Sequence, residues 1–306
     1  MKKFSFFLLV MVMSVMSIGA TKLPYPIQGE YVGKLVNTPK DDFFKPDFLI
    51  QKANDAVLTD TKPEDIKIDS EIKLTDPIYG SVLLGEDEKP TYFTMAKDHD
   101  GYWMDFYLDQ NHDRQITAAE KINSLEKWNP QKVNKKWDLK ESSLTNSSLP
   151  ILVSYKSSAG ELKKKLGFYF WIKRFAQGSD EQTFVTFATA SVFEGFIKVY
   201  FKKDEKLVKF RVTDGNCNGC FNDYGKDFWY LDLNFDGNFS KKEAMPLYEF
   251  FDFKAGKTTT QMRFLIPACP GGIAVIPATQ NYDTVKYWKR LPIHSNLRVK
   301  GSLWAY

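Results

Sequence analysis

The chain has 306 residues, with 42 Lys and Arg against 38 Asp and Glu, and its basic residues lie in short, scattered groups. Without one extended basic patch, the sequence gives no indication of a nucleic-acid partner. Three cysteines are too few for a fold held mainly by disulfides. Aromatic residues make up 15% of the chain, which favours β-rich packing because flat rings suit a pleated, half-buried surface.

The first twenty residues have the pattern of a secretory signal peptide. Lys2 and Lys3 precede an apolar run over residues 4–16, and small residues follow as far as Ala20. The run is shorter than the roughly 20 apolar residues that span a bilayer. We therefore expect cleavage near Ala20, no membrane span in the mature chain, and an exported protein that is periplasmic or secreted.

Two distant segments of the chain resemble each other. Residues 102–109 and 226–232 both carry an aromatic stretch that ends in an aspartate, and these two aspartates, Asp109 and Asp232, are 123 positions apart. Such self-similarity at a fixed spacing indicates an internal repeat.

The similarity extends upstream of both aromatic stretches. Gly80 with the acidic turn 87–89 corresponds to Gly195 with the acidic turn 204–206. An apolar stretch that ends in an aspartate follows each turn, and these aspartates are Asp98 and Asp214. The order of strand, acidic turn, strand, Asp-rich loop, aromatic strand and Asp-rich loop therefore occurs twice.

These observations predict a mainly β fold with short helices, built from tandem β-rich repeats over residues 21–145 and 146–306. The polar stretch Glu141–Ser148 is expected to link the two copies. Thr117 and Glu120 have the spacing of a capping box, which predicts a short helix from Thr117 to Trp128. Further strands are expected over residues 150–155, 166–172 and 184–200.

A twelve-residue pattern of oxygen-bearing side chains follows each aromatic strand, over residues 109–120 and 232–243. In an EF-hand-type loop, ligands to calcium come from positions 1, 3, 5 and 7, often through water from position 9, and from a bidentate Glu at position 12. The predicted metal ligands are Asp109, Asn111, Asp113, Gln115 and Glu120 in the first loop and Asp232, Asn234, Asp236, Asn238 and Glu243 in the second.

Calcium is the metal that this donor set favours. Each loop supplies three carboxylates and asparagine oxygens, which suit Ca²⁺, and offers no soft ligand for zinc or copper. Position six holds Gly237 in the second loop but Arg114 in the first, and we expect this arginine to point outward. At position eight, Ile116 and Phe239 are expected to anchor the loops to their surroundings.

The second loop, from Asp232 to Ser240 with its terminal Glu243, resembles the calcium loops of the EF-hand and dockerin families. The resemblance covers about a dozen residues in each copy and implies calcium binding. It departs from the helix–loop–helix pattern because Phe228–Leu231 has the composition of a strand. Phe235 and Phe239 also depart from the residues usual in those families.

A third Asp-rich turn begins like the other two. Asp214, Asn216, Asn218 and Gly219 repeat the first half of the pattern, but Gly225 stands where the terminal Glu belongs. Two alternatives stay open at this point: a plain turn or partial site, and a further ion site closed from farther along the chain. The residues that could close it are Asp223 and Asp227.

Two of the three cysteines have the Cys-x-x-Cys spacing of thiol oxidoreductases, but their surroundings do not suit redox catalysis. Cys217 and Cys220 lie among carboxylates that raise a thiol pKa, and no helix follows them. A local disulfide between Cys217 and Cys220 is the first interpretation, with pairing of either to Cys269 as the alternative. The histidines show no zinc-ligand spacing, and His112 is expected to face solvent.

The leading functional hypothesis is an exported calcium-binding protein without a catalytic role, whose ions are structural and whose surface binds or adheres to a protein or glycan. No catalytic motif is visible, and enzymatic activity stays open. One alternative is a thiol-disulfide oxidoreductase that uses Cys217 and Cys220. Another is a carbohydrate-binding protein with exposed aromatic residues, and the candidates are Trp103, Trp229 and Trp304.

Overall fold

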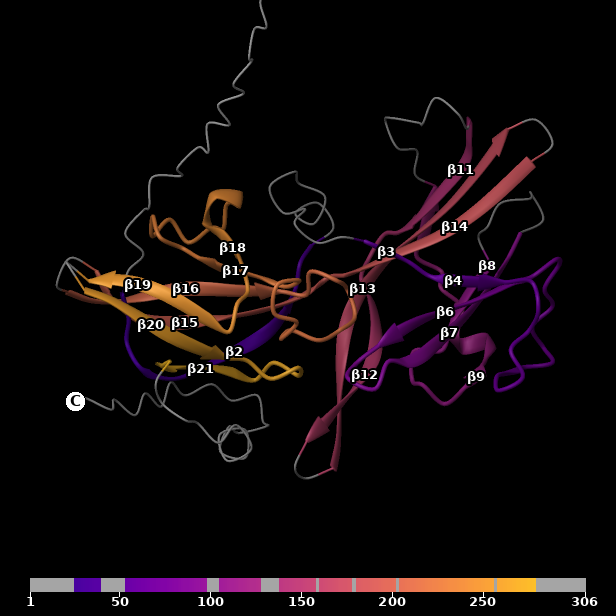
Figure 1. Cartoon of the computed structure of the whole chain (residues 1–306). Helices are drawn as coiled ribbons and strands as arrows, with labels where there is room; N and C mark the ends of the chain where they lie inside the picture. The colour runs from indigo at the N-terminus through magenta and orange to yellow at the C-terminus, as the bar shows by residue number, and fades with distance from the viewer. Residues whose placement is uncertain are drawn as a thin grey trace, which may run out of the picture.

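The computed structural model in Figure 1 is a mainly β molecule, with 61% of its described residues in strands. Within the described residues it contains no α-helix and therefore no helix that could cross a membrane. The predicted signal peptide, Trp103 and Trp304 lie outside these residues. The structure describes residues 25–39, 53–97, 105–127, 138–157, 160–177, 180–201, 204–255 and 258–278.

The largest sheet is a curled half-barrel of nine strands, drawn at the left of Figure 1. All of its pairings are antiparallel. Its strands in order are β18 (Ala244–Pro246), β17 (Phe228–Leu231), β16 (Asp204–Thr213), β15 (Ser191–Phe201), β2 (Gly29–Asn37), β21 (Gly272–Pro277), β20 (Thr258–Leu265) and β19 (Phe250–Ala255), with β1 (Tyr25–Pro26) paired to β15.

A six-stranded sheet is built around the long strand β13 (Gly160–Gln177). The first half of β13 forms a hairpin with β12 (Leu149–Ser157), and its second half lies between two other strands. These are β11 (Asp138–Thr145) and β14 (Asp180–Thr189), and the edges of the sheet are β10 (Leu125–Lys127) and β3 (Asn54–Asp55).

A four-stranded antiparallel sheet and a short parallel pair complete the described strands. The four-stranded sheet has the order β4 (Val57–Thr59), β6 (Ile78–Leu84), β7 (Lys89–Ala96) and β8 (Asp105–Leu108). The parallel pair consists of β5 (Lys67–Ile68) and β9 (Gln115–Ile116). Two single 3-10 turns, η1 (Ala118–Glu120) and η2 (Lys241–Glu243), follow the candidate calcium loops.

Aromatic rings fill the core, as the composition predicts. Phe106 is fully buried, and its ring centroid lies 5.3 Å from that of Phe93 on β7 and 5.6 Å from that of Phe170 on β13. In the half-barrel, Trp229 is fully buried 4.6 Å from Phe264 and 5.0 Å from Phe251. Truncating such a ring to alanine typically costs about 3–5 kcal/mol. These clusters position the strands that lead into the candidate loops.

Two predicted elements are wrong. The helix expected from Thr117 to Trp128 is only η1, because the chain turns extended at Lys121 and then pairs with β8 through a bridge to Tyr107. The capping box itself is present, with Thr117 and Glu120 contacting each other reciprocally. The expected linker Glu141–Ser148 lies in β11 and the turn after it, because β13 offers a long edge for pairing.

The strands predicted after that stretch are confirmed. Residues 150–155 lie in β12, residues 166–172 in β13, and residues 184–200 in β14 and β15. Strands of the two predicted repeats also share sheets, because β2 lies between β15 and β21, and β3 pairs with β14. The boundary at residue 145 stays a prediction.

Candidate calcium loops

Each candidate loop begins where the short aromatic strand ends. β8 pairs with β7 and β17 with β16, and the first loop residue continues each pairing by one hydrogen bond. The Asp109 N–H donates to the Tyr92 carbonyl at 2.9 Å, and the Asp232 N–H donates to the Lys209 carbonyl at 3.0 Å. Both starting aspartates are thus fixed to a sheet edge, and both are buried.

A glycine and a phenylalanine lie beside the strand in both places. Gly80 pairs with Phe93 and Gly195 with Phe210, on the strand next to β8 or β17. A Cβ added to Gly80 would lie 2.1 Å from the ring of Phe93, and one added to Gly195 would lie 2.8 Å from the ring of Phe210. Only glycine leaves room for these rings, so both positions serve packing of the strand that carries the loop.

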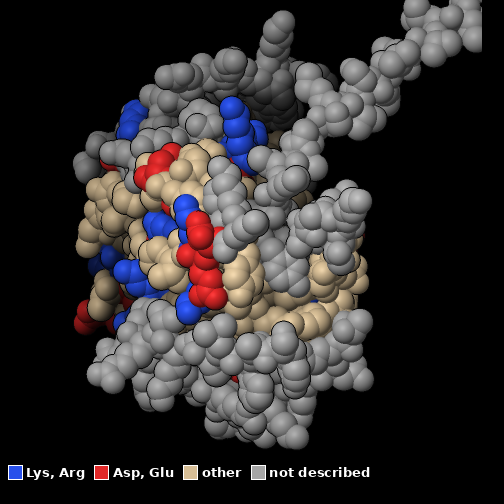
Figure 2. Space-filling model, turned by 90° about the vertical axis from the view of Figure 1, so that its left-hand side faces the viewer, with Lys and Arg blue, Asp and Glu red and all other residues tan. Residues whose placement is uncertain are grey.

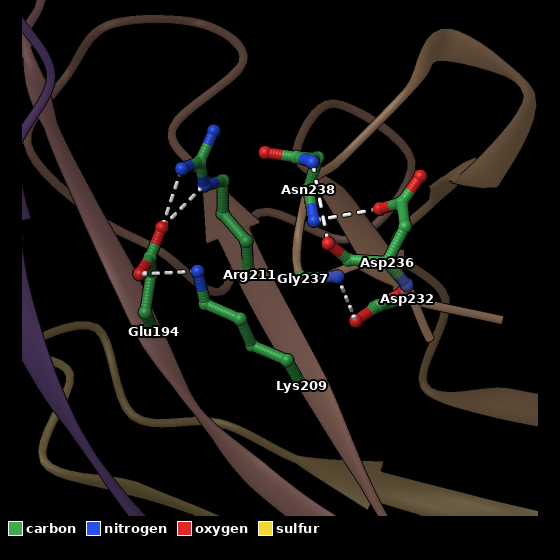
Figure 3. Close-up of polar contacts among 7 residues, drawn as sticks. All are labelled: Glu194, Lys209, Arg211, Asp232, Asp236, Gly237 and Asn238. Atoms are coloured by element: carbon green, nitrogen blue, oxygen red, sulfur yellow. Dashed lines mark hydrogen bonds and ion pairs between the residues drawn. The ribbon is translucent and has the colours of Figure 1, made fainter. Parts of the chain in front are cut away.

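The second loop is curled by its own side chains (Figure 3). Asp232 accepts the Asp236 N–H at 3.1 Å and the Gly237 N–H at 3.0 Å, one on each carboxylate oxygen. Asn234 Oδ1 also accepts the Asp236 N–H at 2.9 Å, and Asp236 Oδ1 accepts the Asn238 N–H at 2.8 Å. Positions one, three and five therefore hold the backbone in a tight turn.

The first loop has the same set of hydrogen bonds. Asp109 accepts the Asp113 N–H at 3.2 Å and the Arg114 N–H at 3.1 Å. Asn111 Oδ1 accepts the Asp113 N–H at 2.8 Å, and Asp113 Oδ1 accepts the Gln115 N–H at 2.8 Å. Each bond recurs 123 positions later in the second loop, although the two loops are identical in sequence only at positions one, three, five and twelve.

The glutamate at position twelve folds back on each loop. Glu120 Oε2 accepts both the N–H and the hydroxyl of Thr117, at 3.0 and 3.1 Å, and Glu243 Oε2 does the same with Ser240, at 3.0 and 2.9 Å. Glu243 Oε1 accepts the Leu233 N–H at 3.0 Å. In contrast, Glu120 Oε1 is buried without a hydrogen-bond partner. A buried carboxylate oxygen of this kind needs a donor or a cation.

Backbone torsions are alike in the two loops. Positions four and six have positive φ: 61° at His112 and 62° at Arg114, and 62° at Phe235 and 81° at Gly237. This left-handed region is strained for every residue here except glycine. The Arg114 side chain is exposed and its guanidinium lies 3.4 Å from the carboxylate of Asp65, outside the loop, which agrees with the outward orientation predicted for it.

Position eight anchors the first loop, as predicted. Ile116 is fully buried in a small cluster with Ile66 and Tyr107. Its strand β9 pairs in parallel with β5, and the Asp69 N–H donates to the Ile116 carbonyl at 2.9 Å. The second half of this loop is therefore tied to a segment 48 residues earlier in the chain.

In the second loop, Phe239 is held by β16 and β17 instead. Its ring lies 5.9 Å from the ring of Tyr230, and the guanidinium of Arg211 lies 4.6 Å from its centroid. Lys209 approaches the same ring at 4.9 Å, and Figure 3 shows that Glu194 of β15 contacts both cations. Sequence reasoning missed this group, although alternate charged residues on paired strands are a visible signal.

Burial raises the pKa of Asp109 to about 6, and the nearby carboxylates of Glu120 and Asp113 raise it further, while hydrogen bonds from the loop backbone oppose this rise. His112 does not face solvent as expected. It is partly buried with its Nε2 against the Thr91 hydroxyl, because the left-handed turn at position four directs it toward β7. Burial, followed by the positive charges of two nearby lysines, lowers its pKa.

Within the described residues, no group of three or more His, Cys, Asp or Glu side chains converges as a metal site by itself. The loops instead mix carboxylates with amides: Asn111 Nδ2 donates to Asp113 at 3.1 Å, and Asn234 Nδ2 donates to Asp236 at 2.9 Å. A half-turn of an amide exchanges its nitrogen for its oxygen. The side chains are thus oxygen donors of the type that Ca²⁺ prefers.

The third Asp-rich turn repeats three of the four backbone hydrogen bonds that curl the first seven residues of the two loops, and only the bond to the position-three oxygen, Asn216 Oδ1, is absent. Asp214 accepts the Asn218 N–H at 3.2 Å and the Gly219 N–H at 2.7 Å, and Asn218 Oδ1 accepts the Cys220 N–H at 2.8 Å. Positions four and six again have positive φ, 56° at Cys217 and 81° at Gly219.

The three cysteines are thiols in this structure, so their pairing stays a prediction. Cys217 and Cys220 are buried, and burial raises the pKa of both thiols far above the ordinary value, reinforced by the carboxylate of Asp214 at Cys217 and by that of Asp223 at Cys220. Burial raises the pKa of Cys269 to about 12. These surroundings oppose formation of a reactive thiolate.

One aromatic candidate for glycan binding is wrong. Trp229 is fully buried between Phe251 and Phe264, because its position on β17 faces the interior of the half-barrel. Trp103 and Trp304 lie outside the described residues.

The surface at the half-barrel end of the molecule carries mixed charge. Figure 2 shows acidic and basic side chains interspersed among uncharged residues on the described part of this face. Comparisons of the chain with protein-family models, curated proteins and solved structures found no match. The role of the loops therefore has to be inferred from their geometry and donor chemistry.

Proposed function

We propose that this is an exported calcium-binding protein, built on an internal repeat, in which calcium is structural. Residues 109–120 and 232–243 each hold one ion, with side-chain ligands at positions one, three, five and twelve and a backbone carbonyl at position seven. The rigid surface held by these ions binds or adheres to a protein or glycan.

The main support is the recurrence of one hydrogen-bond set in two loops 123 positions apart. Ten hydrogen bonds from backbone N–H groups to side chains at positions one, three, five and twelve form this set, five in each loop. Chance acidic turns have no reason to share all of these contacts and also the positive φ values. The unpartnered oxygen of Glu120 adds a buried group that a cation would satisfy.

Calcium would connect the two ends of each loop. Position one follows the aromatic strand, and position twelve precedes a chain segment that pairs back onto that strand. The Ile122 N–H donates to the Phe106 carbonyl at 2.7 Å, and Ala244 of β18 pairs with Tyr230 of β17. An ion held by both ends therefore stabilises the strand, the loop and the returning segment as one unit.

The two alternatives have less support. Buried thiols with raised pKa values do not suit a thiol-disulfide oxidoreductase. Burial of Trp229 removes one of the three residues on which glycan stacking was predicted. Neither alternative accounts for the shared geometry of the loops.

Isothermal titration calorimetry of the purified protein with Ca²⁺, and separately with Mg²⁺, tests the proposal. We expect calcium to bind, and we expect Asp109→Asn and Asp232→Asn each to remove one bound ion. Asp252→Asn is the matched control, because Asp252 is an exposed carboxylate outside the loops. Calcium binding that neither loop variant changes would contradict the assignment of the loops.

A further inference from the structure

The third Asp-rich turn, residues 214–227, lies where the half-barrel meets the other sheets (Figure 1). It connects β16 to β17 within the half-barrel. The Gly85 N–H of the β6–β7 turn donates to the Asn218 carbonyl at 2.7 Å, and the Tyr155 hydroxyl of β12 donates to the Gly219 carbonyl at 2.6 Å. Three sheets therefore contact this one turn.

Two carboxylates of the turn are fully buried. Asp214 and Asp227 are both 0% exposed. Asp214 accepts the Thr189 hydroxyl at 2.6 Å, and Asp227 accepts the Gly215 N–H at 2.9 Å and the Asp223 N–H at 2.8 Å. Among the described residues, neither carboxylate forms an ion pair with a Lys, Arg or His. Two uncompensated buried charges are costly unless a cation or a proton neutralises them.

A third carboxylate and an unsatisfied amide oxygen lie beside them. Asp223 Oδ2 accepts Asn216 Nδ2 at 2.8 Å and Asn218 Nδ2 at 2.6 Å. The Oδ1 atom of that same Asn216 amide is sealed from solvent and has no hydrogen-bond partner. An amide oxygen in this situation loses its water without replacement, so it points to a missing electropositive partner.

The chemistry of these groups suits calcium. Asp214, Asp223 and Asp227 provide carboxylates, and Asn216 and Asn218 provide amide oxygens, and all of these are hard-oxygen donors. The three carboxylates do not converge as a metal site by themselves in this structure, so the amide oxygens are part of the proposed ligand set. The thiol of Cys217 interacts with the backbone carbonyl of Asp214 at 3.8 Å. Counted from Asp214, Asp223 and Asp227 stand at positions 10 and 14 of the turn. They take the place of the glutamate at position twelve of the loops 109–120 and 232–243.

We propose that Asp214, Asn216, Asn218, Asp223 and Asp227 form a third calcium site, and that its ion fastens the half-barrel to the adjoining sheets. The site goes beyond the proposed function, because it requires no ion in either of the other loops. The two buried carboxylates are neutralised by the ion, and the amide oxygen of Asn216 gains its partner.

Native mass spectrometry of the protein equilibrated with Ca²⁺ counts the ions. We expect three ions in the wild type, two in Asp227→Asn, one in the double variant Asp109→Asn/Asp232→Asn, and none when all three changes are combined. Asp252→Asn should keep three. Asn216→Ala removes one neutral ligand without changing the charge, and it should weaken binding of one ion roughly tenfold in a calcium titration. Asn216→Ala also tests the third site if the Asp227→Asn variant does not fold.

The outcomes separate this site from the other two. Two ions in the wild type, unchanged by Asp227→Asn and Asn216→Ala, would overturn the third site and leave the proposed function standing. That result would mean that protons neutralise Asp214 and Asp227. One ion, lost in Asp227→Asn but kept in the double loop variant, would support the third site and overturn the proposed loops. No ion in any variant would overturn both.

Discussion

The sixth position of the loops is glycine in the second copy and arginine in the first. Gly237 has φ of 81° with nothing near its missing Cβ, and Arg114 takes a similar φ of 62°. We predict that Gly237→Ala lowers the free energy of unfolding by about 1 kcal/mol, because an L-residue is strained in this region. For a chain of this size, the shift in melting temperature should be about 2–4 °C.

Gly271→Ala is the matched control, since Gly271 is exposed with open space around it and no positive φ. Thermal unfolding monitored by circular dichroism compares the two variants. Equal melting temperatures for Gly237→Ala and Gly271→Ala would show that the loop does not hold position six in the left-handed conformation.

We expect His112 to make the stability of the fold depend on pH. Burial and the charges of Lys163 and Lys89 lower its pKa below 6.5 in the folded protein, so the unfolded chain binds its proton more readily. The stability of the fold should therefore fall as the pH drops below about 6.5. We predict that the melting temperature of His112→Gln falls less than that of the wild type between pH 7.5 and pH 5, in saturating calcium. Parallel curves would refute this role of His112.

At the scale of single residues, the sequence predicts which side chains could bind an ion better than it predicts the burial and contacts of a side chain. The spacing of Asp232, Asn234 and Asp236 predicts side chains that curl one short loop, and the hydrogen bonds of the loop agree with that. The burial of Trp229 and the contact of His112 with Thr91 could not be predicted, because both depend on which face of a strand or turn meets the core.

At the scale of elements, a glycine facing a phenylalanine ring supports each loop-bearing strand. We predict that Gly80→Ala lowers the free energy of unfolding by roughly 2 kcal/mol, because a new Cβ would lie 2.1 Å from the ring of Phe93. In a Phe93→Leu background the same change should cost clearly less. Urea unfolding of the four proteins provides the double-mutant cycle. An unchanged cost in that background would exclude the ring as the cause.

The type of an element can be predicted from sequence where a long residue pattern specifies it. The prediction fails where backbone pairing with another strand decides the structure. β12 and β13 follow from their β-branched and aromatic runs. The helix predicted after the first loop fails because a capping box specifies only one turn, and backbone pairing with β8 takes over at Lys121. The stretch 141–145 is polar, yet it becomes part of β11 because β13 supplies a neighbouring strand.

For the whole molecule, the β class follows from composition, but the sheet order does not. β2 precedes the first loop in sequence and still lies between β15 and β21. Such pairings join residues more than 150 positions apart, and no local pattern encodes them. The central position of residues 214–227 was likewise not predictable from the turn sequence alone.

The central claim is that calcium stabilises this fold through its Asp-rich loops. A ligand that binds only the folded state raises its stability, by about 2.7 kcal/mol per site at a concentration one hundred times the dissociation constant. For this size of chain, that corresponds to roughly 5 °C or more per site.

The most direct measurement is the thermal unfolding midpoint in excess calcium and in chelator, for the wild type, Asp109→Asn and Asp232→Asn. We predict a higher midpoint in calcium and a smaller rise in each variant. A wild-type midpoint that is the same in calcium and in chelator would contradict a structural role for calcium.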